Sequence, residues 1–341
     1  MILWILAINS AFGVEAANER IDNSSTVPEV WVCHSDLNTL VQDDAEWDFV
    51  REHLTGIQFY IDQFNRYSTE EMGKLANMIR EAGLKVSVEC GGTLDFGPMD
   101  DTNGKWSAEV ELQKFKKYTD AGGHIDYLNL DGPVRRLLYP TADREGFSSN
   151  EACAEQLVIY IREVLNVYPH MQFFLLTNFP NWGYKGEVSY HARGLQRMDW
   201  GDYHEVFQTV LRVLKAADLP LVGLTIDNPY EYAIGTRQSA TLEDPTAIDW
   251  GARIKDLQEN AVSAGLEVNM IINSESGGES SALAFHDETL KFLHWYLEHL
   301  PKPNRIFIQS WYTHPREVVP ETQAGTMMAL VKEAIQVIHS H

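Results

Sequence analysis

The stretch Tyr127-Leu-Asn-Leu-Asp-Gly-Pro133 alternates apolar and polar residues and then stops at a Gly-Pro pair. Such alternation is typical of a β-strand, on which successive side chains point to opposite faces. Leu128 and Leu130 would share one face of this strand, while Asn129 and Asp131 would share the other. A polar face buried in an ordinary core costs free energy, so the pattern predicts a strand whose second face meets a polar cavity.

Similar segments recur along the chain, each followed by a longer stretch of helical periodicity. The strands are expected within residues 29–36, 56–64, 84–92, 125–133, 172–180, 221–229, 267–278 and 305–315. One helix carries a capping box, with Ser68 and Glu71, and is closed by Gly83. A chain of 341 residues has room for two domains. However, strands and helices that alternate in this way, without a glycine-rich phosphate motif after the first strand, favour one (β/α)8 TIM barrel over an open doubly wound sheet. We expect the barrel to span residues 28–341.

The alternation also predicts which side chains line the barrel. In the segment 221–229, Val222, Leu224 and Ile226 would face the helices, and Asp227 would face inward. The same rule turns a polar set inward on the other strands: Gln58, Tyr60, Asp62, Ser87, Glu89, Asn129, Asp131, Thr225, Asn269, Asn273, Glu275, Gln309 and Trp311. The loops after the strands, at 91–106, 132–149, 179–201 and 228–248, are longer than those before them, as in barrels that work at the C-terminal ends of their strands.

Carboxyl groups are the most informative members of this inward set. Asp62, Glu89, Asp131, Asp227 and Glu275 come from different strands and are expected at one mouth of the barrel. The fifth strand adds Asn178, and the first, whose alternation is ambiguous, offers His34 and Asp36. A single carboxylate at a strand end usually caps a helix or pairs with a cation. Several like charges in one place repel one another and shift pKa values, which indicates catalysis or a metal.

The overall composition excludes some classes of partner. The formal net charge is −22, which disfavours binding to nucleic acid or to an anionic membrane surface. Cys33, Cys90 and Cys153 have no metal-type spacing and are expected to be buried thiols. We expect a monomer or small homo-oligomer.

The first residues suggest a targeting signal. Residues 1–19 have an apolar start and then small residues, which predicts a signal peptide and a secreted or periplasmic protein, although the basic start of such a leader is missing. The alternative is a buried N-terminal segment. The apolar run is too short to span a bilayer.

Glycoside hydrolysis fits a mouth that is rich in carboxyl groups. It needs two of them beside the scissile bond, one protonated and one ionised, and neighbouring charges push their pKa values apart. The loops also supply aromatic rings on which sugars stack, namely Trp106, Trp182, Tyr184, Trp200, Tyr203, Tyr230, Tyr232, Trp311 and Tyr312. The candidates for binding a carbohydrate substrate are Asp62, Tyr60, Asn129, Asn178, Trp182, Asn273, Gln309, Trp311 and His34. This reading needs no cofactor and no metal.

The layout resembles the (β/α)8 glycoside hydrolase superfamily. Asp131 at the end of the fourth strand and Asp227 at the end of the sixth are similar to the clan that includes retaining α-galactosidases. That resemblance implies that Asp131 is the nucleophile or transition-state stabiliser and Asp227 the general acid/base. Glu275 and Glu89 are the substitutes. The clan with Glu at strands four and seven fits less well, because only Glu275 matches it and its Asn-Glu pair at strand four is replaced by "NLDGP".

Three alternatives stay open. One is a divalent-metal-dependent hydrolase or isomerase that would add His34, His191 or His314 as ligands, although the first strand lacks an HxH pair. Another is a non-catalytic carbohydrate-binding barrel. A polysaccharide lyase would need a basic cluster, for which only the pair Arg135 and Arg136 offers itself. We interpret this pair as surface residues that could also bind an anionic sugar.

Overall fold

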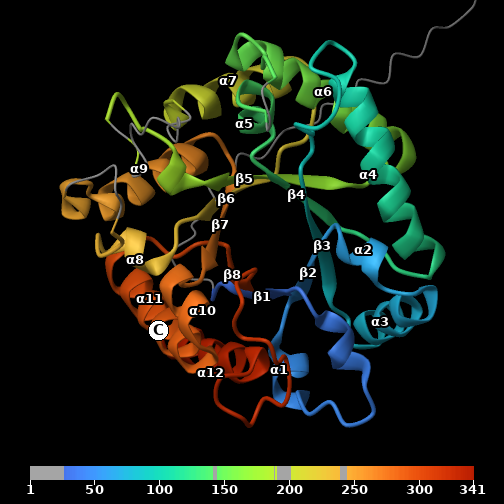
Figure 1. Cartoon of the computed structure of the whole chain (residues 1–341), viewed down its shortest axis with the longest axis vertical. Helices are drawn as coiled ribbons and strands as arrows, with labels where there is room; N and C mark the ends of the chain where they lie inside the picture. Colours follow the sequence, from blue (N-terminus) through green and yellow to red (C-terminus); the bar gives the residue numbers. More distant parts are fainter. Residues whose placement is uncertain (1–26, 141–143, 188, 190–200, 239–243) are drawn as a thin grey trace, which may run out of the picture.

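The computed structural model describes residues 27–140, 144–187, 189, 201–238 and 244–341. Across these ranges eight parallel strands close into a barrel in which each strand lies beside its sequence neighbour and β8 pairs with β1. Figure 1 looks into this ring of strands, with helices around it. The predicted single-domain (β/α)8 TIM barrel is therefore confirmed. The leader predicted over residues 1–19 lies outside the described residues.

The elements have the following bounds. The strands are β1 (Glu29–His34), β2 (Gly56–Tyr60), β3 (Lys85–Cys90), β4 (Tyr127–Asp131), β5 (Gln172–Asn178), β6 (Gly223–Asp227), β7 (Glu267–Ile272) and β8 (Arg305–Ser310). The longer helices are α3 (Thr69–Glu81), α4 (Asn103–Asp120), α6 (Asn150–Val167), α7 (Tyr203–Ala216), α9 (Trp250–Ser263), α11 (Ala282–His299) and α12 (Met327–Ser340). The shorter ones are α1 (Asp48–His53), α2 (Gln63–Arg66), α5 (Pro133–Leu138), α8 (Tyr230–Ala233) and α10 (Glu275–Ser280). Three 3-10 turns are η1 (Leu37–Val41), η2 (Phe179–Asn181) and η3 (Pro245–Ala247).

Local sequence signals explain where these helices start and stop. The Glu71 backbone N–H donates to Ser68 Oγ at 3.2 Å, and the Ser68 N–H donates to Glu71 Oε2 at 2.8 Å. The predicted capping box of α3 is thus confirmed. Gly83 follows the helix with φ of +67°, a left-handed conformation that favours glycine and ends the helix.

Two hydrophobic cores hold the barrel. The larger one lies between the strands and the helices, where Val86, Leu224 and Ile306 are completely buried. The smaller one fills the lower part of the barrel interior and consists of Trp31, Tyr127, Phe174, Leu176, Ile271 and Phe307. Because strand side chains alternate, the two cores come from opposite faces of the same strands. The barrel is therefore a packed core and not a pore.

A charged residue closes this interior core at the end where the strands begin. Arg305 pairs with Glu29 at 2.8 Å and with Glu267 at 2.5 Å. Its guanidinium carbon also lies 5.3 Å from the ring centre of Tyr127 and 5.1 Å from that of Phe174. These contacts compensate the burial of its charge, so this end of the barrel is sealed.

A polar layer lies above the aromatic core. Gln58 Oε1 accepts hydrogen bonds from Ser87 Oγ and from Asn129 Nδ2, both at 3.0 Å. On the other side of the barrel, Asn269 Nδ2 donates to Thr225 Oγ1 at 3.1 Å. These side chains are completely buried and bond from one strand to another inside the barrel, so the predicted inward turn of the polar residues is confirmed for them. The layer forms the floor of the mouth.

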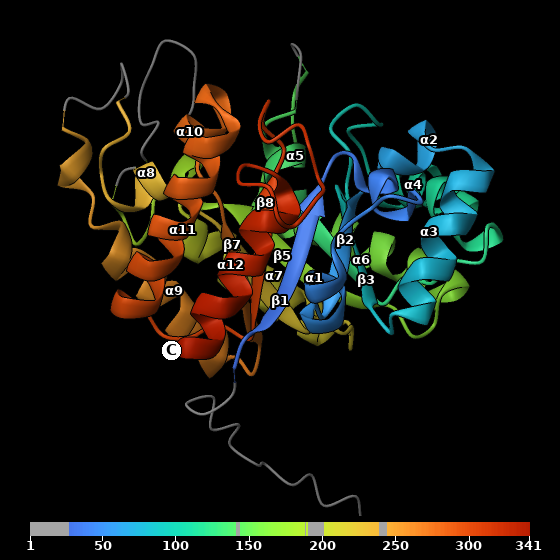
Figure 2. The same ribbon diagram turned by 90° about the horizontal axis from the view of Figure 1, so that it is seen from below.

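The short helices α5, α8 and α10 lie at the end of the barrel where the strands stop. Figure 2 shows α5, α8 and α10 together at this end.

The thiols of Cys33, Cys90 and Cys153 are free and buried, as predicted. No helix within the described ranges is long and apolar enough to cross a membrane.

Candidate active site

Four carboxyl groups stand above the polar floor at or just after strand ends. Glu89 lies on β3, Asp131 ends β4, Asp227 ends β6, and Glu275 begins α10 shortly after β7. Their charges act on one another: Asp131 and Asp227 both raise the pKa of Glu89, while Asp131 and Glu275 both raise the pKa of Asp227. The four groups therefore occupy one electrostatically coupled site, although they come from four different strand segments.

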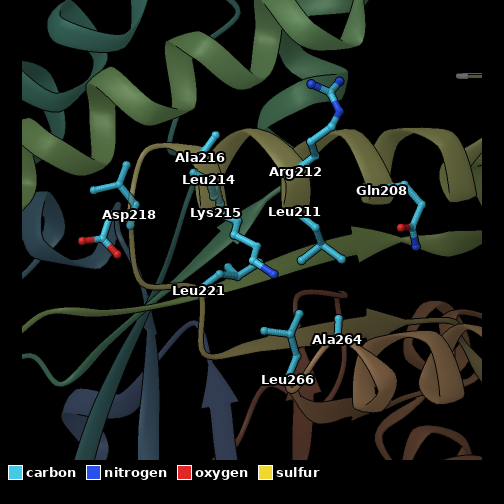
Figure 3. Close-up of a pocket in the computed structure, with 11 residues that line it drawn as sticks. Gln208, Leu211, Arg212, Leu214, Lys215, Ala216, Asp218, Leu221, Ala264 and Leu266 are labelled. Atoms are coloured by element: carbon cyan, nitrogen blue, oxygen red, sulfur yellow. The ribbon is translucent and has the colours of Figure 1, made fainter. Parts of the chain in front are cut away.

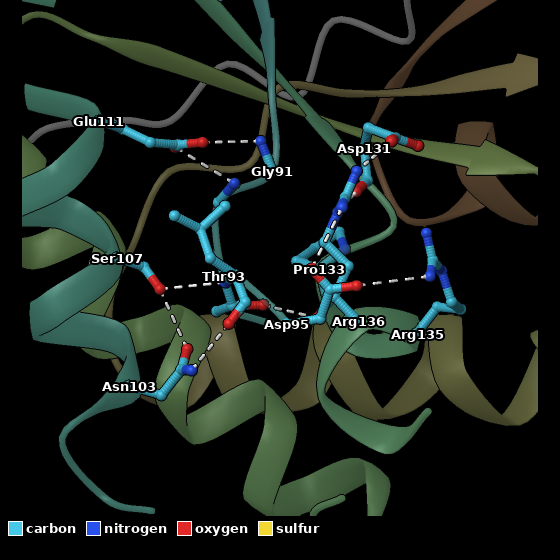
Figure 4. A network of polar contacts seen from close by, with 12 residues as sticks. Gly91, Thr93, Asp95, Asn103, Ser107, Glu111, Asp131, Pro133, Arg135 and Arg136 are labelled. Atoms are coloured by element: carbon cyan, nitrogen blue, oxygen red, sulfur yellow. Dashed lines mark hydrogen bonds and ion pairs between the residues drawn. The ribbon is translucent and has the colours of Figure 1, made fainter. Parts of the chain in front are cut away.

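Asp131 is held as a charged group. Arg136 Nη2 donates to Asp131 Oδ2 at 2.6 Å, and Arg136 Nε donates to the Asp131 backbone oxygen at 2.9 Å. Asn178 Nδ2 donates to the other carboxylate oxygen at 3.0 Å. Figure 4 shows the Arg136 contacts together with Asp95, whose carboxylate lies 3.8 Å from Arg136. A cation and an amide donor thus stabilise and orient the negative charge of Asp131.

Glu275, which follows β7, is held by an arginine and a neutral donor, as Asp131 is. Arg237 Nη2 forms an ion pair with Glu275 Oε1. The Tyr232 hydroxyl donates to Glu275 Oε2 at 2.7 Å. Because both oxygens accept strong hydrogen bonds, the charge of Glu275 is also stabilised.

Asp227 has the opposite character. Its side chain is buried, and Asn273 Nδ2 donates to its Oδ1 over a long 3.4 Å. Among the described residues, no lysine or arginine forms an ion pair with it. Burial, opposed by the Asn273 hydrogen bond and supported by the charge of Asp131, raises the pKa of Asp227 to about 7. A group of this kind can exchange a proton near neutral pH.

Glu89, like Asp227, forms no ion pair with an arginine among the described residues. Gln58 Nε2 and Gln309 Nε2 both donate to Glu89 Oε2, at 3.1 and 2.9 Å. Burial and then the charge of Asp131 raise the pKa of Glu89 to about 8, although the Gln309 hydrogen bond opposes them. The four carboxyl groups therefore form two classes: Asp131 and Glu275 carry arginines, whereas Glu89 and Asp227 carry only neutral amide donors.

Several buried polar atoms around the mouth have no hydrogen-bond partner in the part of the chain that the structure describes. They include the Tyr312 hydroxyl and Asn273 Oδ1, whereas the Tyr60 hydroxyl meets the Cys33 thiol, a weak hydrogen-bonding group. The charges of Glu89 and Asp227 act on Tyr60, and those of Asp227 and Glu275 act on Tyr312, so both rings border the carboxyl groups. Because an unpaired buried polar group costs free energy, these atoms are suited to hydrogen-bonding a polar ligand.

Three predicted binding residues do not face this site. Asp62 follows the end of β2 in a helical conformation, and its carboxylate is largely exposed and pairs with Lys114 of α4 at 2.7 Å. His34 is buried, and its two ring nitrogens contact the Pro315 carbonyl and the Asp36 N–H at 2.9 and 3.1 Å. Trp182 is buried in the outer core, where it packs on Tyr203. Their expected orientation toward a substrate is wrong.

Four other predicted residues, Asn129, Asn178, Asn273 and Gln309, lie in or under the mouth. Asn129 is completely buried below Gln58, so it supports the floor and is not open to a ligand. Gln309 contacts Glu89, Asn178 contacts Asp131, and Asn273 contacts Asp227, as described above. Trp311 follows β8 and is 60% exposed. Tyr184, Tyr203 and Tyr232 are buried, whereas Trp200 lies outside the described residues.

The sequence analysis missed the roles of two arginines. Arg136, interpreted as a surface residue, is half-buried and directed at Asp131. Gly132 has φ of +58°, and this left-handed residue turns the chain so that α5 carries Arg136 back toward the strand end. Arg237 reaches Glu275 from a loop after α8. Neither pairing has a signal in local sequence spacing, because one depends on the turn at Gly132 that directs α5 and the other on how the loop after α8 folds.

The described residues offer no set of ligands for a metal centre. The described residues contain no group of three or more His, Cys, Asp or Glu side chains that could hold a metal ion. Both nitrogens of His34 already contact backbone groups. His191 lies outside the described residues.

A large groove lies at the other end of the barrel. It has a volume of about 720 Å³ and runs between α7, the loop after it and the end of α9, with Leu211, Leu221 and Leu266 in its wall (Figure 3). Its residues precede β6 and β7, so it opens at the end where the strands begin, away from the four carboxyl groups. Its size alone therefore does not make it the active site.

Comparison with known proteins gives the fold. No protein-family model matches the chain, and no curated protein matches it either. The GH53 catalytic domain of Ignisphaera aggregans is 11% identical with a TM-score of 0.50, and the match covers 92% of this chain and 96% of that one. The chain shares the (β/α)8 barrel.

Other solved structures with the same barrel have different activities. A D-psicose 3-epimerase from Clostridium cellulolyticum H10 is 11% identical, with a TM-score of 0.43 and coverage of 92% and 97%. An endo-beta-N-acetylglucosaminidase from Cordyceps militaris is 9% identical, with a TM-score of 0.46 and coverage of 93% and 92%. The neighbours thus include glycoside hydrolases and epimerases, and function must be argued from the site.

Proposed function

We propose that the chain is a glycoside hydrolase, with Asp227 as general acid/base and Asp131 as nucleophile or transition-state stabiliser. The observation that carries the proposal is the contrast between the two groups. Arg136 and Asn178 stabilise the charge of Asp131, whereas Asp227 is buried without a cation and has a pKa raised to about 7. Glycosidic cleavage needs one carboxyl group in each of these states.

In the proposed reaction, Asp227 donates its proton to the glycosidic oxygen as the bond to the sugar breaks. The Asp131 carboxylate stabilises the positive charge that develops on the sugar. Asp227, now ionised, then accepts a proton from the water that completes hydrolysis. Arg136 and Asn178 hold Asp131 in place and do not exchange protons.

The unpaired polar atoms at the mouth support a polyhydroxylated substrate. The Tyr312 hydroxyl and Asn273 Oδ1 are buried and have no partner within the described ranges. Sugar hydroxyls can both donate and accept, so a single sugar ring can satisfy such mixed groups. Discrimination by buried polar groups is strong, because a substrate that lacks the hydroxyl leaves them unpaired.

The test uses the full chain with nitrophenyl glycosides and soluble polysaccharides, in the presence and absence of a chelator. We expect hydrolysis that survives chelation and is lost in Asp131→Asn and Asp227→Asn. Asp62→Asn is the matched control, because Asp62 also follows a strand end but pairs with Lys114 outside the barrel. Activity that disappears on chelation would favour the metal-dependent alternative. Glycan binding without turnover would favour a non-catalytic barrel.

A second candidate function is proton transfer at a sugar carbon, as in an isomerase or epimerase. It is favoured by the finding that Glu89 and Asp227 both have pKa values raised to about 8 and about 7. Two such groups in one site could remove a proton from one position and return it at another. Incubation of free sugars in deuterium oxide distinguishes the two functions, since only proton transfer incorporates carbon-bound deuterium.

A further inference from the structure

A second cleft lies on the rim of the same mouth. It has a volume of about 530 Å³ and lies between the β3–α4 loop and the residues that lead to α6, with Phe96, Trp106, Arg144 and Glu145 in its wall. The Phe96 side chain is 56% exposed, although large apolar side chains are mostly buried in this protein. An exposed aromatic ring in a concave site indicates a binding surface.

The loop presents Phe96 in a defined position. The Phe96 ring meets Trp106 edge-on, with ring centres 5.5 Å apart and an interplanar angle of 81°. Gly97 lies flat on the Trp106 ring, where a Cβ atom would collide with it. Arg144 Nη1 donates to the Gly97 carbonyl at 2.8 Å, and buried Asn103 Nδ2 donates to the Leu94 carbonyl at 3.0 Å. These contacts hold the Phe96 ring outward in advance of binding, which lowers the entropy cost of capturing a ligand.

The loop that carries Phe96 also contacts the arginine that holds Asp131. Asp95 precedes Phe96, is buried, and lies 3.8 Å from Arg136. Arg136 in turn holds Asp131 (Figure 4). A ligand chain that leaves the carboxyl groups along this side of the mouth therefore reaches Phe96 across a single layer of ion-paired side chains.

We propose that this cleft is an outlying subsite that binds a sugar ring of the same chain whose glycosidic bond is cut at Asp131 and Asp227. The inference rests on the proposed function and narrows its substrate to oligo- and polysaccharides. The C–H face of a sugar ring packs on an aromatic face such as that of Phe96, and the exposed Arg144 and Glu145 can hydrogen-bond its hydroxyls. The volume falls within the range of small-ligand sites, whereas a stable protein partner needs a much larger surface.

The first experiment measures the binding of a polysaccharide and not the rate of its hydrolysis. Mobility of the full chain is compared in native gels with and without soluble xylan, galactan, mannan or β-glucan. Wild type, Phe96→Ala and Phe96→Tyr are compared with Val167→Ala, a control that removes an apolar side chain of 55% exposure from the far end of α6. We expect Phe96→Ala to weaken binding of the retarding polysaccharide about tenfold, and Phe96→Tyr and Val167→Ala to retain it.

A kinetic readout separates this inference from the proposed function. The ratio of kcat/KM on the polysaccharide to that on the corresponding nitrophenyl monoside should fall about tenfold in Phe96→Ala. Equal ratios in Phe96→Ala and wild type would overturn the subsite while leaving the hydrolase in place. Polysaccharide binding that depends on Phe96 in a protein without hydrolytic activity would support the cleft as a sugar site and reject the hydrolase. If none of the polysaccharides retards the wild type, the subsite is rejected.

Discussion

Arg136 donates two hydrogen bonds to Asp131: Nη2 donates to the carboxylate at 2.6 Å, and Nε donates to the backbone oxygen of the same residue at 2.9 Å. This double contact fixes both the charge and the direction of the carboxylate. A second arginine, Arg237, pairs with Glu275, whereas Glu89 and Asp227 carry only amide donors. Burial is the first cause that raises the pKa values of Glu89 and Asp227, and neither group forms an ion pair with an arginine in the described ranges.

Replacing Arg136 with alanine should reduce kcat/KM by about a hundredfold or more, because a buried charge pair loses its cation. The charge of Arg136 also lowers the pKa of Glu89, so its removal should raise that pKa further. Steady-state kinetics over a range of pH would measure both effects. Arg136→Lys should recover part of the activity, since it keeps the charge but not the fork of donors. An unchanged pH profile in Arg136→Ala would contradict this role.

Asp227→Asn should reduce turnover by about 10²–10⁴-fold, as expected for loss of a general acid. The loss should be smaller on substrates with a strongly acidic leaving group, because they need less protonation. In the wild type, kcat/KM should fall as the pH rises above about 7, when Asp227 loses its proton. Asp62→Asn should keep wild-type activity, and equal losses in both variants would remove the special role of Asp227.

The difference in stability between Asp227→Asn and the wild type should depend on pH in a defined direction. The pKa of Asp227 is raised from 3.8 to about 7 in the folded state, so between these values the native protein holds a proton that the unfolded chain releases. Wild-type stability therefore falls through this group as the pH rises from about 4 to about 7, while the Asn variant loses nothing. Thermal melts at pH 4 and pH 8 should show that the advantage of the variant grows with pH. A constant difference would mean that the carboxyl group is not destabilised by burial.

Glu89→Gln tests the other raised carboxyl group. The new side chain keeps an oxygen that can accept from Gln58 and Gln309, so the fold should be retained. The pKa of Glu89 is raised from 4.5 to about 8, hence its ionisation removes stability as the pH rises across that interval. Denaturant titrations at pH 5 and pH 9 should show the variant gaining on the wild type at the higher pH. Equal midpoints for both proteins at pH 9 would contradict the prediction.

Tyr60→Phe should separate binding from folding. The Tyr60 hydroxyl is buried beside the Cys33 thiol, which is only a weak hydrogen-bonding group, so its removal should change the melting temperature little. Affinity for substrate should fall about tenfold, because a substrate hydroxyl loses its partner. Wild type and Tyr60→Phe should have equal affinity for a deoxy-sugar substrate that lacks the hydroxyl group to which Tyr60 would bond. A large loss of stability would instead indicate that the hydroxyl is part of the folded network.

The strand alternation predicted much of this structure. Side chains such as Ser87, Asn129 and Thr225 line the interior as expected, because the side-chain period of a strand is a local property. The rule failed for Asp62, since β2 ends at Tyr60 and Asp62 lies in the turn that leads into α2. The separate expectation that Trp182, a loop residue, contacts substrate also failed, because the loop folds its side chain into the outer core.

What the sequence determined by itself is the barrel and the supply of acids at its mouth, because apolar periodicity and strand-end position act over a few neighbouring residues. What only the tertiary structure decided is which acids meet a cation. Arg136 reaches Asp131 from helix α5, and Arg237 reaches Glu275 from the loop after α8. Because electrostatic interactions depend on separation in space and on burial, the protonation of Glu89 and Asp227 follows from the folded chain and not from its local pattern.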